Sequence, residues 1–91
     1  MTPEPIRYWS SNGVRSGLLV NRGRRWLYIM LMDYPIKIRR VPVSAIQSIQ
    51  ALKLKGQPYP VTRAVNIFKR SVKRCYGTLR KAPKDVRKAL S

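Results

Sequence analysis

The residues of this chain best suited to chemistry are cations that recur at helical spacing. Arg63, Arg70 and Arg74 fall within about 40° of one another on a helical wheel, and Asn66 and Lys73 flank them. Like charges four residues apart destabilise a helix, and this segment contains no acid to offset them. A plain solvated face is the alternative, but solvated faces normally mix charges of both signs. We interpret the stripe as a contact for a polyanion, such as the phosphates of a nucleic acid.

Two further basic clusters could add to this contact. Arg22-Gly23-Arg24 is a predicted turn, and Arg25 follows it directly; arginines there can enter a minor groove or clamp phosphates, although an ordinary exposed turn explains them equally well. The segment 80–88 carries five cations that can neutralise phosphates; the alternative is a loosely ordered tail. The predicted nucleic-acid-binding residues are Arg22, Arg24, Arg25, Arg63, Asn66, Arg70, Lys73, Arg74, Arg80, Lys81, Lys84, Arg87 and Lys88.

Other kinds of chemistry lack the residues they need. The chain has three acids (Glu4, Asp33 and Asp85), one cysteine and no histidine. Acid–base hydrolysis by paired carboxylates, the usual zinc sites and a cysteine–histidine nucleophile are therefore all difficult or impossible to build. Cys75 lies on the apolar side of the predicted helix, which indicates a buried structural thiol. We expect no catalytic residue, no metal, no cofactor and no disulfide.

Charge and hydropathy define the broad class of the protein. Its 91 residues carry a formal net charge of +17, and 44% of them are hydrophobic, which is typical of a folded domain. The longest apolar run, Trp26–Met32, is too short to span a membrane, and the N-terminus does not resemble a signal peptide. We expect a soluble cytoplasmic protein without membrane contact, whose self-repulsion is relieved by a polyanion.

The chain divides into a strand-rich part, residues 1–57, and a basic helical extension, residues 58–91, which we expect to form one structural unit. Asn12-Gly13 is a strong signal for a hairpin turn. The predicted strands are Ile6–Ser10, Val14–Asn21, Arg25–Met32, Ile36–Val41 and Ile46–Leu52, with a loop at Lys53–Tyr59.

The third predicted strand has two apolar faces, formed by Leu27, Ile29 and Leu31 on one side and by Trp26, Tyr28, Met30 and Met32 on the other. One face therefore needs cover from another element or from a partner. The segment after Pro60 offers such an element: a helix with Thr62 as its N-cap, ending at about Tyr76 before Gly77. Its apolar side carries Ala64, Val65, Phe68, Val72, Cys75 and Tyr76.

A short second helix is expected from Pro83, as its first residue, to about Leu90, with Asp85 in its first turn. Its apolar positions are Val86, Ala89 and Leu90. From the sequence we expect them to dock weakly, or only when a partner is present.

The stretches 13–20 and 40–46 resemble those of small SH3-like barrels, in which a short 3₁₀ corner precedes the last strand. The resemblance covers residues 6–52 and implies a five-stranded antiparallel SH3-like barrel followed by the two helices, in the α+β class. The chain also resembles the compact, very basic proteins that bacteriophages encode. Since such barrels serve many functions, the fold alone does not decide the function.

These observations together predict a non-enzymatic nucleic-acid-binding protein. We expect it to hold double-stranded DNA, in preference to RNA, through phosphate contacts with little sequence specificity. Arg22, Arg24 and Asn66 are the best candidates for contacts to bases. The alternatives are a structural RNA-binding protein and a viral or host-modulating interaction module that docks an acidic protein, with the doubly apolar third strand as its anchor.

Overall fold

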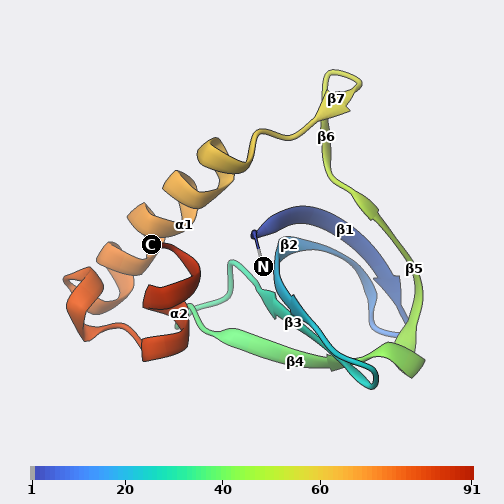
Figure 1. The fold of residues 1–91 in the computed structure, drawn as a ribbon, viewed down its shortest axis with the longest axis horizontal. Coiled ribbons are helices and arrows are strands. Elements are labelled where there is room, and N and C mark those ends of the chain that lie inside the picture. Colours follow the sequence, from blue (N-terminus) through green and yellow to red (C-terminus); the bar gives the residue numbers. More distant parts are fainter. Residues whose placement is uncertain (1) are drawn as a thin grey trace.

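The computed structural model describes residues 2–91, which form a curved antiparallel sheet followed by helices (Figure 1). The α+β class is therefore confirmed. The five-stranded sheet contains β1 (Glu4–Ser10), β2 (Gly13–Arg22), β3 (Trp26–Met30), β4 (Ile38–Pro42) and β5 (Ile46–Ala51). The 3₁₀ turn η1 (Val43–Ala45) joins β4 to β5, as the predicted corner requires. The helical part contains α1 (Val61–Tyr76), the 3₁₀ turn η2 (Leu79–Lys81) and α2 (Lys84–Ala89).

The sheet is an antiparallel meander to which β5 is added beside β1, in the order β4-β3-β2-β1-β5. The predicted β1–β2 hairpin is confirmed, but its turn residues are Ser11 and Asn12: Ser10 pairs with Gly13, which begins β2 with a φ of 106°. The ladder between β2 and β3 shifts register between Leu19 and Asn21. Within residues 2–91, β4 and β5 do not pair with each other, so the sheet is not closed and the expected barrel is unconfirmed.

The concave face of the sheet builds one of two apolar cores. Leu27, Ile29 and Leu31 are buried there against Ile6, Tyr8 and Leu19. Val41, Ile46 and Ile49 pack at the edge of this cluster. The inner face of the third strand is thus covered by the sheet itself, as the sequence predicted.

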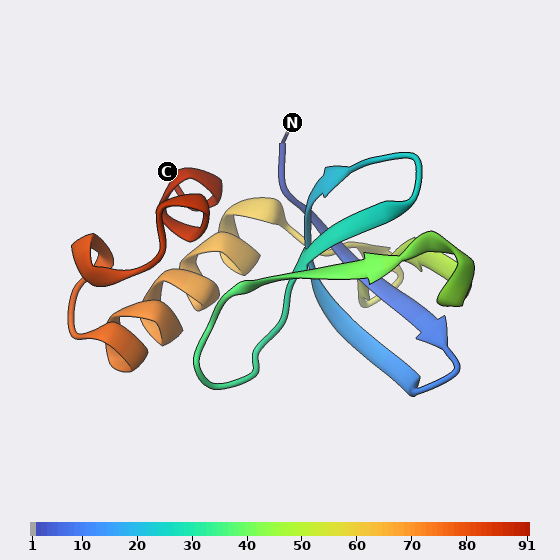
Figure 2. The same cartoon turned by 90° about the horizontal axis from the view of Figure 1, so that it is seen from below.

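The convex face carries the second core, which the helices cover (Figure 2). Leu18 and Met30 of the sheet are buried against Phe68 and Val72 of α1, which confirms the predicted packing of that helix. The backbone of β2 lies close to Met30 at Gly17: a Cβ there would lie 2.8 Å from the Met30 carbonyl oxygen. The second apolar face of the third strand is therefore covered in part: Met30 is buried, Trp26 and Tyr28 are half-buried, and Met32 is 47% exposed.

The last residues are part of the second core, which corrects the expectation of weak docking. Val86 and Leu90 are 0% and 2% exposed, and Ala82 is also buried. These three side chains belong to the same buried cluster as Phe68. The sequence could not predict this packing, because three apolar residues in a short, highly basic segment are a weak signal without knowledge of their partners.

The helix boundaries differ slightly from the predicted ones. α1 begins at Val61 and its N-cap is Pro60, so the prediction of Thr62 as N-cap was wrong; no side chain caps the helix. As predicted, α1 ends before Gly77, which has a φ of 86° and donates its N–H to the Lys73 carbonyl. Pro83 is the N-cap of α2 rather than its first residue.

Three strand predictions also need correction. β3 ends at Met30 and β4 begins only at Ile38, so Ile36 is buried in the connecting loop rather than in a strand. Lys53–Tyr59 is not a plain loop, because β6 (Lys53–Leu54) and β7 (Gln57–Pro58) form a small hairpin there. Val14 is 55% exposed, although it shares a face with Leu18 in the predicted strand.

Candidate nucleic-acid interface

The exposed side of α1 is a cationic face without acidic residues. Its apolar side is held in the convex core through Ala64, Phe68 and Val72, which fixes the rotation of the helix about its own axis. The opposite side must then project the remaining side chains into solvent. The sequence-predicted residues on this helix are all exposed: Arg63, Asn66, Arg70, Lys73 and Arg74.

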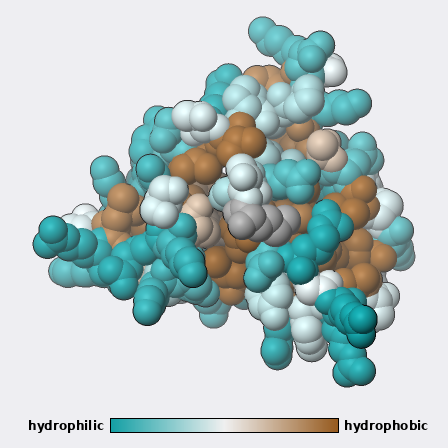
Figure 3. All heavy atoms as spheres, in the orientation of Figure 1, coloured by the Kyte–Doolittle hydropathy of each residue, from teal (hydrophilic) through white to brown (hydrophobic). Residues whose placement is uncertain are grey.

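The tail cations belong to the same helical unit. Because Ala82, Val86 and Leu90 are buried, the backbone of residues 82–90 is held against the core and cannot behave as a solubilising tail. Hydrophilic side chains project where α1 passes into η2 (Figure 3). The five predicted residues of this segment are exposed: Arg80, Lys81, Lys84, Arg87 and Lys88.

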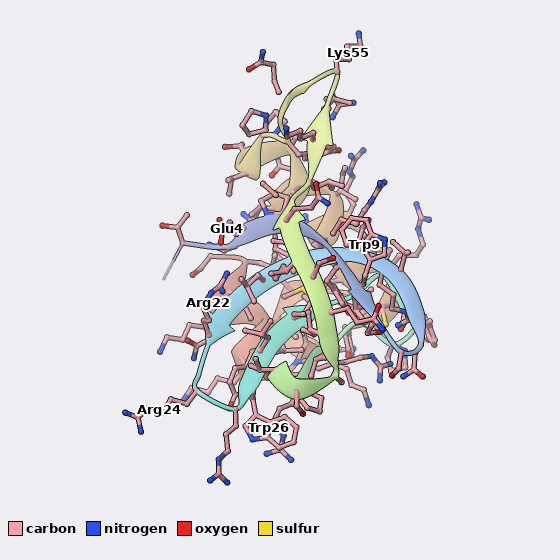
Figure 4. All side chains as sticks on the ribbon, turned by 90° about the vertical axis from the view of Figure 1, so that its right-hand side faces the viewer. Glu4, Trp9, Arg22, Arg24, Trp26 and Lys55 are labelled. Atoms are coloured by element: carbon pink, nitrogen blue, oxygen red, sulfur yellow. The ribbon has the colours of Figure 1, made fainter. Side chains whose placement is uncertain are left out.

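The arginines of the β2–β3 turn form a separate group. Arg22, Arg24 and Arg25 are exposed, and Figure 4 shows Arg22 and Arg24 pointing away from the sheet. In both Figure 1 and Figure 2 this turn lies at the opposite end of the molecule from the helices. The structure therefore brings the helical cations together at one end but does not bring the turn to them.

The positive charge of the helical face is not neutralised by ion pairs. Among residues 2–91, the ion pairs that form join Arg15 and Arg39 to Asp33, at 2.8 and 3.6 Å. None of the predicted contact residues is part of them. Lys73 and Arg74 lie in the last turn of α1, where cations interact favourably with the helix dipole, but Arg63 in its first turn has no such support.

The aromatic side chains do not form a free stacking platform on the helical face. Phe68 is buried, and the guanidinium of Arg40 lies over the Trp26 ring, 4.1 Å from its centroid. Arg63 lies 5.9 Å from the centroid of the Tyr59 ring. Tyr34 is 82% exposed, but it lies in the β3–β4 loop of the sheet.

A second basic site was missed by sequence reasoning. A cleft of about 660 Å³ lies beside β4, and four cations line it: Arg15, Lys37, Arg39 and Arg40. The ring of Tyr8 is buried beneath it, and this burial raises the pKa of the Tyr8 phenol. The run Lys37-Ile38-Arg39-Arg40 was the only signal in the sequence, and the contribution of Arg15 depends on the tertiary fold.

The remaining chemistry-bearing residues are dispersed or used in packing. Cys75 is half-buried against the convex core. The Tyr76 hydroxyl donates to the Ile36 carbonyl at 2.6 Å, and burial raises the pKa of this phenol. Within the described range 2–91, no three His, Cys, Asp or Glu side chains lie close enough to hold a metal ion. None of the helices between residues 2 and 91 has both the length and the apolar character needed to cross a membrane.

Comparison with known proteins assigns no relative to this arrangement. Neither a family model, nor a curated protein, nor a solved structure matches the chain. The function must therefore be argued from the residues of the site.

Proposed function

We propose that this protein binds nucleic acid without catalysing a reaction, and that its principal ligand is double-stranded DNA held through the phosphate backbone. The observation that carries the proposal is the exposed face of α1, on which every charged side chain is a cation while the opposite face is held in the core. Such an array is unfavourable in the free protein, because like charges repel. Phosphates relieve that repulsion and release their counterions on binding.

The docked second helix supports this proposal. Cations on an ordered backbone lose less conformational entropy on binding than cations on a flexible tail. Lys84, Arg87 and Lys88 are presented by such a backbone, because Val86 and Leu90 hold α2 in the core. A preformed positive surface suits a regular, stiff polyanion such as a duplex.

A duplex is favoured over single-stranded RNA because of the aromatic residues. Sequence-specific RNA recognition commonly stacks unpaired bases on exposed aromatic rings. On α1, Phe68 is buried, and Tyr76 is half-buried with its hydroxyl bonded to Ile36. The helical face therefore offers cations without stacking partners. Of its side chains, Asn66 remains the candidate for a contact to a base.

We further propose that the curved sheet is an open form of an SH3-like barrel. The strand order β4-β3-β2-β1-β5 and the η1 turn before the last strand support this assignment. So does the concave core, to which all five strands contribute side chains. We also propose a cytoplasmic location, where nucleic acid is accessible.

A salt titration tests the proposal of duplex binding. Each phosphate contact should contribute about −0.9 to the slope of log K against log salt. Replacing Arg63, Arg70 and Arg74 together by Gln should weaken binding to all duplex sequences alike and flatten the slope by roughly three units if all three touch phosphate. Fluorescence anisotropy with duplexes of unrelated sequence measures both quantities.

Two charge-matched triple variants serve as controls. The first replaces Arg7, Lys53 and Lys55 by Gln; these residues are exposed on β1 and the β6–β7 hairpin, outside every predicted contact. The second replaces the exposed turn residues Arg22, Arg24 and Arg25 by Gln. If the turn variant loses binding and the helix variant does not, the interface lies at the sheet end. Affinity that ignores salt in all variants would exclude phosphate contacts.

The non-enzymatic part of the proposal has its own test. Glu4, Asp33 and Asp85 lie on β1, in the β3–β4 loop and on α2, so no two of them share an element. Any nuclease activity in a preparation should survive their joint replacement by Gln or Asn, because a contaminant would cause it. Loss of activity in a variant that still folds would show that the protein is an enzyme.

Docking of an acidic protein is the second candidate function, and the cleft beside β4 favours it. The third strand, the anchor expected for such a partner, is free only in part: Leu27, Ile29, Met30 and Leu31 are buried within the chain, whereas Met32 is 47% exposed. The four cations that line the cleft suit an acidic partner.

A further inference from the structure

The cleft beside β4 follows the free edge of the sheet. It is lined by every residue from Lys37 to Pro42 in succession. Successive side chains of a strand point to opposite faces, so a cleft that touches all of them must run along the strand edge. In Figure 2 the β4 ribbon passes in front of the β1–β2 hairpin, whose residues Ser10 and Arg15 line the other wall.

The backbone of β4 offers unpaired hydrogen-bonding groups to this cleft. The Val43 N–H donates to the Arg25 carbonyl at 2.9 Å, so these two residues form a hydrogen-bonded pair. Such pairs recur at every second residue of an antiparallel ladder, and Arg39 with Ile29, four residues back along β4, is therefore another. The N–H and C=O groups of Ile38 and Arg40 then point away from β3. Pro42, which has no N–H, occupies the next outward position, as is usual at a sheet edge.

The charge of the cleft selects an acidic ligand. Asp33 at its rim already accepts a hydrogen bond from Arg15 at 2.8 Å and lies 3.6 Å from Arg39. This contact demonstrates that two guanidinium groups are oriented to hold a carboxylate. Lys37 is exposed and forms no ion pair within residues 2–91. With Arg40, four cations line the cleft, and Asp33 offsets one of them, so three net positive charges remain along a strand edge of about 20 Å.

We propose that an acidic, extended peptide segment of a partner protein binds in this cleft by adding a strand to the free edge of β4. Main-chain hydrogen bonds to Ile38 and Arg40 supply affinity, and carboxylates facing Arg15, Lys37 and Arg39 supply selectivity. A second copy of this chain does not fit the site, because the protein carries only three acids against 20 cations. A nucleic acid offers phosphates but no backbone donors and acceptors at strand spacing. The proposal specifies the second candidate function and is separate from duplex binding by the helical face.

The probe for the test is a fluorescein-labelled octapeptide of alternating glutamate and valine, with its lysine–valine counterpart as control. Two further versions carry N-methyl groups on alternate amides, one in each register. Only one set of amides faces β4 in a strand pair, so one methylated version should bind at least about ten-fold more weakly and the other should retain affinity. Equal affinity of the two versions would overturn strand addition.

Protein variants locate the peptide. Arg15→Gln with Lys37→Gln should weaken peptide binding about ten-fold, whereas the charge-matched Arg63→Gln with Arg70→Gln should change it less than about two-fold. The effects on duplex DNA should be reversed. Loss of peptide binding in the helix variant would place the peptide on α1 and overturn the proposal, while leaving nucleic-acid binding intact. Failure of duplex binding alone would leave the cleft proposal standing.

Hydrogen exchange and a third variant complete the test. Binding should slow exchange of the Ile38 and Arg40 amides and leave those of Arg39 and Val41 unchanged. Asp33→Asn should tighten peptide binding, because it frees both guanidinium groups; weaker binding would contradict the carboxylate argument. If oligothymidylate binds with equal affinity and the same sensitivity to Arg15 and Lys37, the cleft is a nucleic-acid site and the peptide proposal is wrong.

Discussion

Leu90→Ala should destabilise this protein although it lies next to the C-terminus. The Leu90 side chain is 2% exposed and belongs to the convex core together with Phe68, Val72 and Val86. Truncation removes three carbon atoms from a site whose neighbours come from several elements and cannot collapse freely. Comparable replacements in protein cores cost about 2–5 kcal/mol.

Such a loss is a large part of the free energy of unfolding of a chain this size, which is about 5–14 kcal/mol. A loss of 2 kcal/mol alone should lower Tm by about 8–16 °C. Urea denaturation and a thermal melt measure both effects, with the exposed neighbour Lys88→Ala as control, which should change stability by less than about 0.5 kcal/mol.

The outcome decides between two descriptions of residues 82–90. A cost below about 1 kcal/mol for Leu90→Ala would mean that α2 is not docked in solution. The cations Lys84, Arg87 and Lys88 would then belong to a flexible tail, and only the cations of α1 would form a preformed surface.

Three further predictions concern the sheet and its contact with α1. Phe68→Ala should cost roughly 3–5 kcal/mol in urea denaturation, because it opens a cavity in the convex core; a cost below about 1 kcal/mol would mean that α1 packs elsewhere. Gly17→Ala should cost about 1–3 kcal/mol, since its Cβ would lie 2.8 Å from the Met30 carbonyl oxygen; a variant as stable as the wild type would contradict this close approach. Burial raises the pKa of Tyr8 above 10.0, so the unfolded chain ionises first. The stability linked to this phenol is complete below pH 10.0 and is lost as the pH rises through the raised pKa. The Tm of Tyr8→Phe should therefore fall less than that of the wild type between about pH 9 and about pH 11. An equal fall would refute the raised pKa of Tyr8.

The local structure of this protein could be predicted well where a pattern depends on neighbours in sequence. The Asn12-Gly13 hairpin, the two apolar faces of β3 and the end of α1 at Gly77 all follow from residue type and periodicity, and all are present. The N-cap Thr62 was predicted wrongly because Pro60 and Val61 begin the helix without a side-chain cap.

The candidate interface divides in the same way. The cationic stripe of α1 follows from the sequence, since a 16-residue helix with one apolar side must place its other residues in solvent. The separation of the Arg22–Arg25 turn from the helical cations could not be predicted, because it depends on the path of the sheet. The cleft beside β4 was missed for a similar reason: Arg15 and Arg39 are far apart in the chain, and the fold brings them to the same carboxylate, that of Asp33.

The sequence by itself determined the charge, the class of elements and the kind of partner that the charge favours. These properties are sums over residues or repeat at the period of one helix or strand, so they need no knowledge of distant contacts. The tertiary structure alone decided that Val86 and Leu90 complete the core and that β4 keeps a free edge. Both depend on contacts between residues far apart in the chain, because such contacts decide which apolar surface is buried and which strand edges are paired.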